Sequence, residues 1–351
     1  MLGNKNRLVG LDIGSKSVKA AEIVEGKRGY TLSRFGMVDI GPGLIEEGAV
    51  KDPETVAEIL RSLFKSYGIK NHKVAISIGG YSVIVKKISV QNATEEQLQD
   101  TIHFEAEQYI PFDINDVNLD FQILGENENN PNQMNVLLVA AKKEMVNDYV
   151  SLAELAGLEP RIIDVDAFAL QNIFELNYEP TPNENTALID IGASKTSLNI
   201  LKGNHSVFMR DVSLGCGQIN QKICGLIDCS PDESEAIKFG EGSDKITADD
   251  LSDIISSVVT DWCTEIRRAM DFFYSTYPDD QIKKIILSGG GGNIQELRQL
   301  LAVETSAEVV TINPFNHIYL DSDKFDTEYL DKIAPQASIC MGLATRKMDD
   351  K

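Results

Sequence analysis

Residues 9–14 read VGLDIG and residues 187–192 read ALIDIG, so one pattern occurs twice, far apart in the same chain. In both copies an apolar run typical of a buried strand ends in Asp-Ile-Gly. A segment of Ser, Lys and Thr residues and a second strand follow. An internal repeat limits the possible folds more strongly than a single motif does. The sequence therefore predicts a duplicated domain with a strand–turn–strand unit at the centre of each half.

Both predicted turns are rich in Gly and Ser, which leaves backbone N–H groups available to phosphate oxygens. Asp12 and Asp190 stand beside these turns, and a carboxylate next to a phosphate requires a divalent cation between the two. We therefore expect both carboxylates to face one cleft and to hold Mg²⁺ that is chelated by a nucleotide. Lys19 is expected to reach the phosphates. For either copy alone, ordinary turn chemistry would be the simpler interpretation.

A third glycine-rich turn, Ser288–Asn293 (SGGGGN), follows a predicted strand at Lys284–Leu287 and precedes a predicted helix at Ile294–Leu301. Glycines at such a place let a ligand approach the backbone, and the N-terminus of a helix favours anions. Alone this signal is weak, because it matches neither GxGxxG nor the Walker A pattern, which occurs nowhere in the chain. Three such turns together favour a nucleotide site.

Length and charge limit the classes of function. The 351 residues are enough for two or three domains, and 33 Lys and Arg against 54 Asp and Glu give a net charge of −21. So acidic a chain repels phosphate backbones and anionic lipid, which argues against nucleic-acid partners and direct membrane docking. We also expect neither a signal peptide nor a membrane span. Five cysteines without a CxxC pair indicate reduced thiols in a cytosolic protein.

The segment between the two repeats contains a second pattern of elements that starts near Tyr81. It is either an inserted α+β unit or part of the continuous core of the first domain. The Pro- and Asn-rich stretch Glu179–Asn183 is the predicted linker between the halves. Along the chain we expect strands at Leu8–Ile13, Lys16–Val24, Tyr30–Ile40, Val74–Ile78, Val83–Val90, Val117–Leu124 and Val136–Ala141, of which the first three form a meander. Helices are expected at Pro53–Tyr67, from a capping box at Thr94–Gln97 up to Pro111, at Glu144–Ala156 and at Leu251–Tyr277. A polar loop is expected at Gly125–Asn135.

In this order the three turns resemble the phosphate-1, phosphate-2 and adenosine motifs of the actin-like ATPase superfamily, which includes actin, sugar kinases and FtsA. Within it the chain is most similar to the PilM family of type IV pilus assembly proteins. The resemblance spans nearly the whole chain, and its most family-specific segment is FEAEQYIPF. It implies an α/β fold of two duplicated actin-like (ribonuclease H-like) domains around a nucleotide cleft, with an inserted α+β subdomain, 1C. The implied limits are residues 1–80 and 160–180 for subdomain 1A, 81–159 for 1C, 183–215 and 282–351 for 2A, and 216–281 for 2B.

The same resemblance implies ATP and Mg²⁺ as cofactors, with Asp12 and Asp190 at the metal. Asp166 is the implied catalytic residue, because superfamily members place a water-positioning residue there; a helix N-cap for Ala167–Phe174 is the alternative. For Glu235 and Lys238 the resemblance is to a stretch that borders adenine. The residues implied to bind the cofactor are Asp12, Gly14, Ser15, Lys16, Ser17, Lys19, Asp190, Gly192, Ala193, Ser194, Lys195, Thr196, Gly215, Glu235, Lys238, Glu265, Arg268, Gly289, Gly290, Gly291 and Asn293.

Two of these assignments carry a qualification. Glu265 and Arg268 resemble the pair that flanks base and ribose, but their spacing also suits a solvated helix face. Cys216 stands where family members usually have a second glycine after Gly215. Its side chain is expected to crowd the nucleotide unless the backbone freedom of Gly217 lets the segment move away.

The resemblance implies a cytoplasmic assembly protein, at most a slow ATPase, that binds the cytoplasmic N-terminal peptide of PilN, a bitopic inner-membrane protein, in a groove between 1A and 1C. Other pilus assembly components are further expected partners. Such a protein would be peripheral at the inner membrane through its partner, since the C-terminus lacks the amphipathic anchor of FtsA. The alternatives are a small-molecule kinase of the same superfamily and an FtsA-like filament-forming protein.

Overall fold

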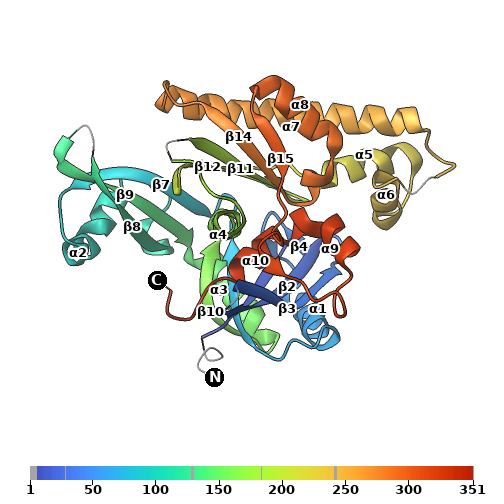
Figure 1. Ribbon diagram of the computed structural model, residues 1–351, viewed down its shortest axis with the longest axis horizontal. Coiled ribbons are helices and arrows are strands. Elements are labelled where there is room, and N and C mark those ends of the chain that lie inside the picture. Colours follow the sequence, from blue (N-terminus) through green and yellow to red (C-terminus); the bar gives the residue numbers. More distant parts are fainter. Residues whose placement is uncertain (1–5, 28, 128–129, 183, 241–242, 351) are drawn as a thin grey trace.

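A computed structural model describes residues 6–27, 29–127, 130–182, 184–240 and 243–350. Two large sheets form its two halves, with a smaller inserted unit to one side (Figure 1). In spatial order, the first sheet contains β10 (Glu159–Val165), β6 (Lys73–Ile78), β1 (Val9–Ile13), β2 (Ser17–Gly26), β3 (Gly29–Asp39) and β16 (Ile318–Tyr319). The second contains β15 (Glu308–Thr311), β14 (Ile282–Ser288), β11 (Asn185–Ile191), β12 (Thr196–Lys202) and β13 (His205–Val212).

The two sheets share one topology. In the first, β1 pairs antiparallel with β2 and parallel with β6, and β10 continues the parallel side. In the second, β11 pairs antiparallel with β12 and parallel with β14, and β15 continues. Each Asp-Ile-Gly segment therefore ends the central strand of its sheet, next to the antiparallel hairpin. This confirms the duplicated α/β fold predicted from the repeat.

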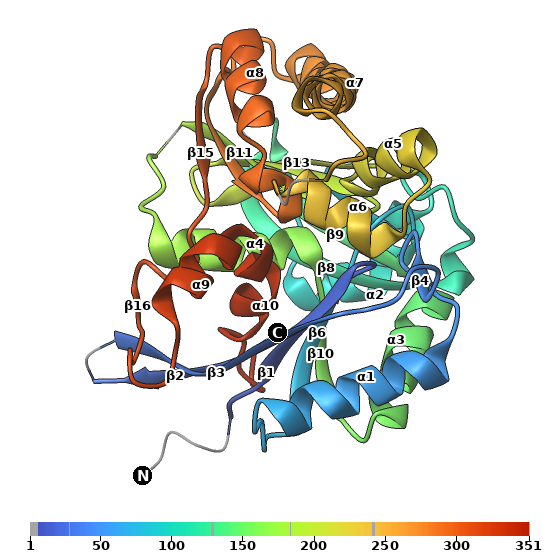
Figure 2. The ribbon, with the colours of Figure 1, turned by 90° about the vertical axis from the view of Figure 1, so that its right-hand side faces the viewer.

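Two helices connect the halves because their apolar faces are buried between the sheets. They are α4 (Asp166–Asn177) and α10 (Ser338–Leu343), which lie in the middle layer of the molecule (Figure 2). One core cluster joins residues of β2, α4, β11 and α10. Gly342 permits this contact, since a Cβ at that position would lie 1.8 Å from the carbonyl oxygen of Ala169. A larger residue there would push α10 away from α4.

Six further helices cover the outer faces of the two large sheets. A first core cluster packs α1 (Pro53–Ser66) and α3 (Lys143–Leu155) on the first sheet. Another packs α7 (Ala248–Thr276) and α8 (Gln295–Thr305) on the second, together with α5 (Gly217–Ile227) and α6 (Pro231–Lys238). The short elements are β4 (Ile45–Glu46), β5 (Ala49–Val50), α9 (Thr327–Ile333) and 3-10 turns at Ile114–Asp116, Gly290–Asn293 and Ala334–Ala337.

Residues between β6 and β10 form a sheet of their own, in the order β7 (Val83–Gln91), β9 (Asn130–Lys142), β8 (Val117–Asn127). Helix α2 (Glu95–Ala106) packs on this sheet, and a separate core cluster joins them. We call β7, α2, β8 and β9 the inserted unit. Its own sheet and core favour the inserted α+β unit over a continuation of the first core, and the predicted domain limits remain predictions.

The sequence-based elements differ from the structure in two places. The capping box is present, with the Gln97 N–H donating to Thr94, but α2 ends at Ala106, before Tyr109 and Pro111. The polar loop at Gly125–Asn135 was wrong, because β8 extends to Asn127 and β9 already begins at Asn130; residues 128–129 lie outside the described residues. Polar side chains fit these strand ends because both faces of the protruding hairpin are exposed, while the backbone ladder still pairs.

Candidate functional site

A cavity of about 510 Å³ lies at the ends of β1, β11 and β14. All three glycine-rich turns contribute to its wall, although they are far apart in sequence. The cofactor and catalytic residues predicted from the sequence that line it are Asp12, Gly14, Ser15, Lys16, Ser17, Lys19, Asp166, Asp190, Gly192, Ala193, Ser194, Lys195, Glu235, Lys238, Gly289 and Gly290. The fold thus brings together most of the predicted set.

The first two turns meet across the cavity. The Ser15 hydroxyl oxygen lies 2.9 Å from that of Ser194, so hairpins of different halves are in hydrogen-bond contact. Asp12 accepts a hydrogen bond from the buried Lys19 ammonium group at 2.9 Å. Burial alone would lower the pKa of Lys19, but the Asp12 carboxylate outweighs this effect and raises it. Lys19 is therefore a fixed positive charge in the cavity wall.

Asp190 is in the opposite electrostatic situation. Its carboxyl group is buried, and no basic side chain among the described residues forms an ion pair with it. Burial raises the pKa of Asp190 to about 6, and the carboxylates of Asp12 and Asp166 add to this rise, while a hydrogen bond from Ser288 and the charge of Lys195 offset only part of it. A buried carboxylate that has no ion-pair partner and lies beside a second carboxylate is a group that a bound cation would stabilise.

Asp166 forms an ion pair with Lys195 that links α4 of the first half to the second turn. Burial would raise the pKa of Asp166, but the Lys195 charge lowers it. Gly79 leaves room for this pair, since a Cβ there would lie 2.3 Å from the Lys195 Nζ. The N-cap alternative for Asp166 was wrong, because Val165 is the N-cap of α4 and the Asp166 side chain is used by Lys195.

At the third turn the backbone itself faces the cavity. Gly289 has a φ of 75°, and a Cβ on it would lie 2.4 Å from the Ile191 carbonyl oxygen, so only glycine fits. A Cβ on Gly290, by contrast, would meet only the Cys216 sulfur, at 4.0 Å. Gly290 therefore leaves open a space that any other residue would begin to fill.

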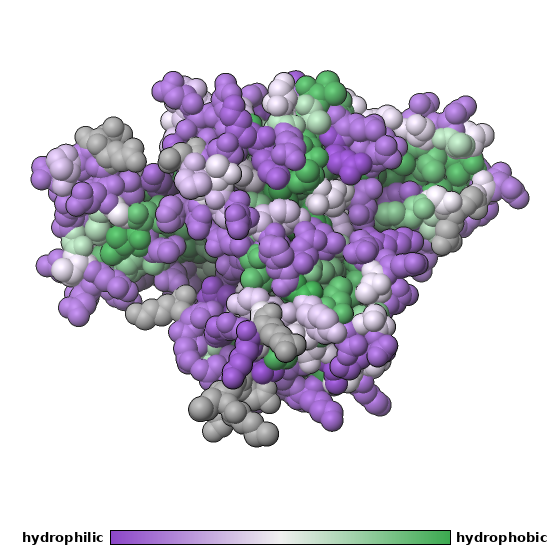
Figure 3. All heavy atoms as spheres, viewed as in Figure 1, coloured by the Kyte–Doolittle hydropathy of each residue, from purple (hydrophilic) through white to green (hydrophobic). Residues whose placement is uncertain are grey.

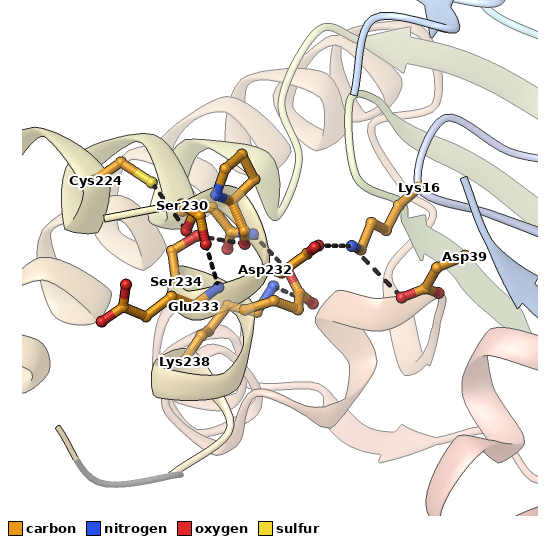
Figure 4. A network of polar contacts seen from close by, with 11 residues as sticks. Lys16, Asp39, Cys224, Ser230, Asp232, Glu233, Ser234 and Lys238 are labelled. Atoms are coloured by element: carbon orange, nitrogen blue, oxygen red, sulfur yellow. Dashed lines mark hydrogen bonds and ion pairs between the residues drawn. The ribbon is translucent and has the colours of Figure 1, made fainter. Parts of the chain in front are cut away.

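Lys16 connects the first turn to the far wall of the cavity. Its ammonium group lies 3.5 Å from Asp39 on β3 and 3.7 Å from Asp232 on α6 (Figure 4). Deeper on the same helix, Lys238 pairs with Glu235 at 2.8 Å, and the Asn220 amide also donates to Glu235. These contacts fix the charged side chains of α6 toward the cavity.

Six predicted cofactor residues do not line the cavity, although three of them support its wall. Thr196 donates to the Leu214 carbonyl, a Cβ on Gly215 would lie 2.5 Å from Ala193, and Gly291 packs against Ile191. Asn293 is exposed and donates to Lys332. Glu265 and Arg268 pair with each other on the exposed side of α7, as the solvated-face alternative expects.

The Cys216 backbone has φ −59° and ψ −22°, which any residue adopts, so this position does not require glycine. Its thiol lines the cavity, and burial raises its pKa to about 12. Its N–H donates to Gly192, and that of Gly217 donates to Ala193, both at 2.9 Å. The segment is thereby attached to the second turn.

Sequence reasoning missed several cavity residues. Gly79 follows the buried strand β6, so its signal was the same strand–glycine pattern that identified the other turns. Tyr149, Asn220 and Gln221 lie on helices and carried no signal, because only the packing of those helices brings them to the cavity. Within the described residues, no group of three or more His, Cys, Asp or Glu side chains is arranged to hold a metal ion.

The fold and the three converging turns define the class of protein, which is that of the actin-like ATPase fold. One solved structure with this fold is MreB 5 of Spiroplasma citri bound to AMPPNP, which is 12% identical over 97% of this chain and 95% of that chain, with a TM-score of 0.52. Another is the ethanolamine utilization protein EutJ from Carboxydothermus hydrogenoformans, which is 12% identical over 98% of this chain and 90% of that chain, with a TM-score of 0.58. A structure of the PilM–PilN type IV pilus biogenesis complex is more similar, with 27% identity over 98% of this chain and 99% of that one, and a TM-score of 0.86.

A family model for the type IV pilus assembly protein PilM matches residues 10–348. The chain belongs to this PilM family, which confirms the resemblance seen in the sequence. Within the part of the chain that the structure describes, none of the helices combines the length and hydrophobicity of a membrane span.

Proposed function

We propose that this chain binds Mg-ATP in the cavity between its two halves and links the cytoplasmic part of the type IV pilus machine to a PilN-like inner-membrane protein. The observation that carries the nucleotide part is the convergence of three glycine-rich turns on one cavity of about 510 Å³. The turns supply backbone N–H groups for phosphates, and Lys19 and Lys195 supply positive charge.

The residues present fit both groups. The buried Asp190 carboxyl has a pKa of about 6 and no ion-pair partner among the described residues, which favours a cation beside Asp12, and the open space at Gly290 favours a ligand against the backbone. When bound, Mg-ATP would supply a terminal phosphate open to transfer to water. Asp166 could orient a water molecule only after its ion pair with Lys195 opens. Because this pair holds the candidate catalytic residue, we expect slow hydrolysis at most.

Replacing Asp12 by alanine is expected to weaken Mg-ATP binding at least tenfold, because it removes one of the two carboxylates that face the metal position. Isothermal titration calorimetry of the folded variant measures the change. Asp232→Ala is the matched control: this carboxylate lies on the opposite wall with a side chain that is 93% exposed, so its loss should change the affinity less than twofold. Equal affinities of wild type and Asp12→Ala would remove Asp12 from the site.

For the partner, we propose that a PilN-like cytoplasmic N-terminal peptide binds between the first sheet and the inserted unit. The similar PilM–PilN complex supports a PilN-like partner, and the place of binding is our proposal. On the face seen in Figure 3, apolar residues gather over the inserted unit and are bounded by polar residues. Tyr81 lies in the connection from β6 to β7, at the joint between the first sheet and the sheet of the inserted unit, and is 63% exposed. Tyrosine is enriched among the residues that contribute most to the binding energy of interfaces, so we take Tyr81 as the proposed anchor. Binding there would hold the protein at the inner membrane.

Tyr81→Ala is expected to weaken binding of a synthetic PilN N-terminal peptide about tenfold, a loss of about 1.4 kcal/mol that is usual for a buried tyrosine anchor. Fluorescence anisotropy of the labelled peptide measures it. Tyr319, on β16 at the far edge of the first sheet, is 66% exposed, and Tyr319→Ala should leave the affinity unchanged. Equal losses in both variants would argue against a site at this joint.

A further inference from the structure

Two cysteines lie together at the corner between α5 and α6. Cys224 is in the last turn of α5, and Cys229 lies in the connection just before Ser230, the N-cap of α6. The two sulfur atoms are 3.8 Å apart, and the Cys224 sulfur points toward the start of α6 (Figure 4). Both thiols are half-buried, whereas Cys216, Cys263 and Cys340 are buried in the cores.

The corner forms part of the cavity wall. Cys224 itself lines the cavity, and so do Asp232 and Glu235 of the helix that follows Cys229. A disulfide requires the sulfur atoms to approach by about 2 Å more. Cys229 belongs to neither helix, so its side chain can make this movement without unwinding α5 or α6. The pair is thus both accessible to small reagents and close to bonding geometry.

We propose that Cys224 and Cys229 are a reversible dithiol–disulfide site, oxidised by small disulfides of the glutathione class. The bond would fix the corner between α5 and α6 and with it one wall of the cavity. Because the closed loop is short, the bond adds little to global stability. Its effect is local, on the mobility of the wall that carries the charged side chains of α6.

The chemistry balances with oxidised glutathione as the only co-reactant. The Cys224 thiolate attacks one glutathione sulfur, which forms a mixed disulfide and releases the first reduced glutathione. The Cys229 thiolate then attacks the Cys224 sulfur and releases the second. The protein loses two electrons and two protons, and one glutathione disulfide becomes two thiols. We take Cys224 as the attacking thiol because it lines the cavity, where a small disulfide can reach its sulfur.

The test exposes the folded full chain to graded ratios of oxidised to reduced glutathione, quenches it with acid, and alkylates all free thiols with N-ethylmaleimide under denaturing conditions. Intact-mass spectrometry is expected to show one oxidised species that carries two maleimide groups fewer than the reduced chain, with no bound glutathione. Proteolysis should yield one linked pair, Cys224–Cys229. Dithiothreitol should restore full alkylation.

Cys224→Ser and Cys229→Ser are reciprocal controls, since each should instead retain one glutathione on the remaining cysteine. The three buried cysteines, Cys216, Cys263 and Cys340, should carry maleimide and no glutathione in every sample, which reports that the chain stayed folded during exposure to glutathione. The proposal would be overturned by stable glutathione adducts on the wild-type chain or by a linkage that involves a buried cysteine. It would also be overturned if oxidised glutathione left Cys224 and Cys229 reduced in the folded chain.

Discussion

Asp190→Asn is expected to make the free protein more stable at pH 7.5, by about 2–3 kcal/mol in the free energy of unfolding. The carboxyl is buried and its pKa is about 6 in place of the ordinary 3.8. The native protein therefore keeps a proton between pH 4 and 6 that the unfolded chain has lost, so stability falls as the pH rises through this window. Above pH 6 the full cost of burying a charge that Ser288 and Lys195 offset only in part is present, and asparagine removes it.

If Mg-ATP binds as proposed, the same substitution is expected to abolish the stabilisation that the ligand gives the wild type, because one of the two carboxylates proposed to hold the metal is lost. Urea unfolding with and without Mg-ATP measures both effects. At pH 4 the gain in the free protein should vanish, since Asp190 is then protonated in the native wild type. A substitution that raises the stability of the free protein and weakens ligand binding indicates that the replaced charge serves function rather than stability.

Asp232→Asn provides the control for the change in charge. It alters the net charge by the same amount on the same cavity, but its side chain is exposed, so the free energy of unfolding should change by less than about 0.5 kcal/mol. If Asp190→Asn instead destabilises the free protein at pH 7.5, nearby lysines already compensate the carboxylate, and the argument for a cation at this position is lost.

The sequence predicted which residues line the cavity where the signal was local. An apolar run followed by Asp-Ile-Gly or by a glycine run indicates a strand that ends in a turn, so Asp12, Asp190 and Gly289 could be placed at strand ends from the sequence alone. Convergence of the three turns followed from the repeat, because equivalent strands occupy equivalent positions in duplicated sheets. Both features are visible in the shared topology of the two sheets.

Sequence reasoning failed where position depends on how a helix packs. The apolar stripe of α7, which includes Trp262, Ile266 and Phe273, was predicted and is buried. The side to which Glu265 and Arg268 then point depends on the angle at which α7 lies on its sheet, and no periodicity encodes that angle. Asn220 reaches the cavity for the same reason. The Asp166–Lys195 pair joins the two halves, so neither local sequence could reveal it.

Lys195→Met is expected to destabilise the protein by about 3–5 kcal/mol at pH 7.5, because it leaves the Asp166 carboxylate buried without a partner. The side chains of the pair are 25% and 13% exposed, so solvent replaces little of the lost interaction. The pKa of Asp166, which Lys195 now lowers, should rise above its ordinary value in the variant. The difference in the free energy of unfolding between wild type and variant should therefore shrink as the pH falls from 7.5 toward 4. Urea unfolding of both proteins across this range measures that difference.

The double variant Asp166→Asn/Lys195→Met separates the ion pair from the bulk of the lysine. If the cost comes from the unpaired carboxylate, the double variant should recover most of the loss and show no pH dependence of its own. Lys16→Met is the matched control, since Lys16 also lines the cavity but pairs with two exposed carboxylates, and its loss should cost less than about 1 kcal/mol. Equal costs for Lys16→Met and Lys195→Met would mean that the Asp166–Lys195 pair does not hold the two halves together, and that Asp166 is already free to act on water.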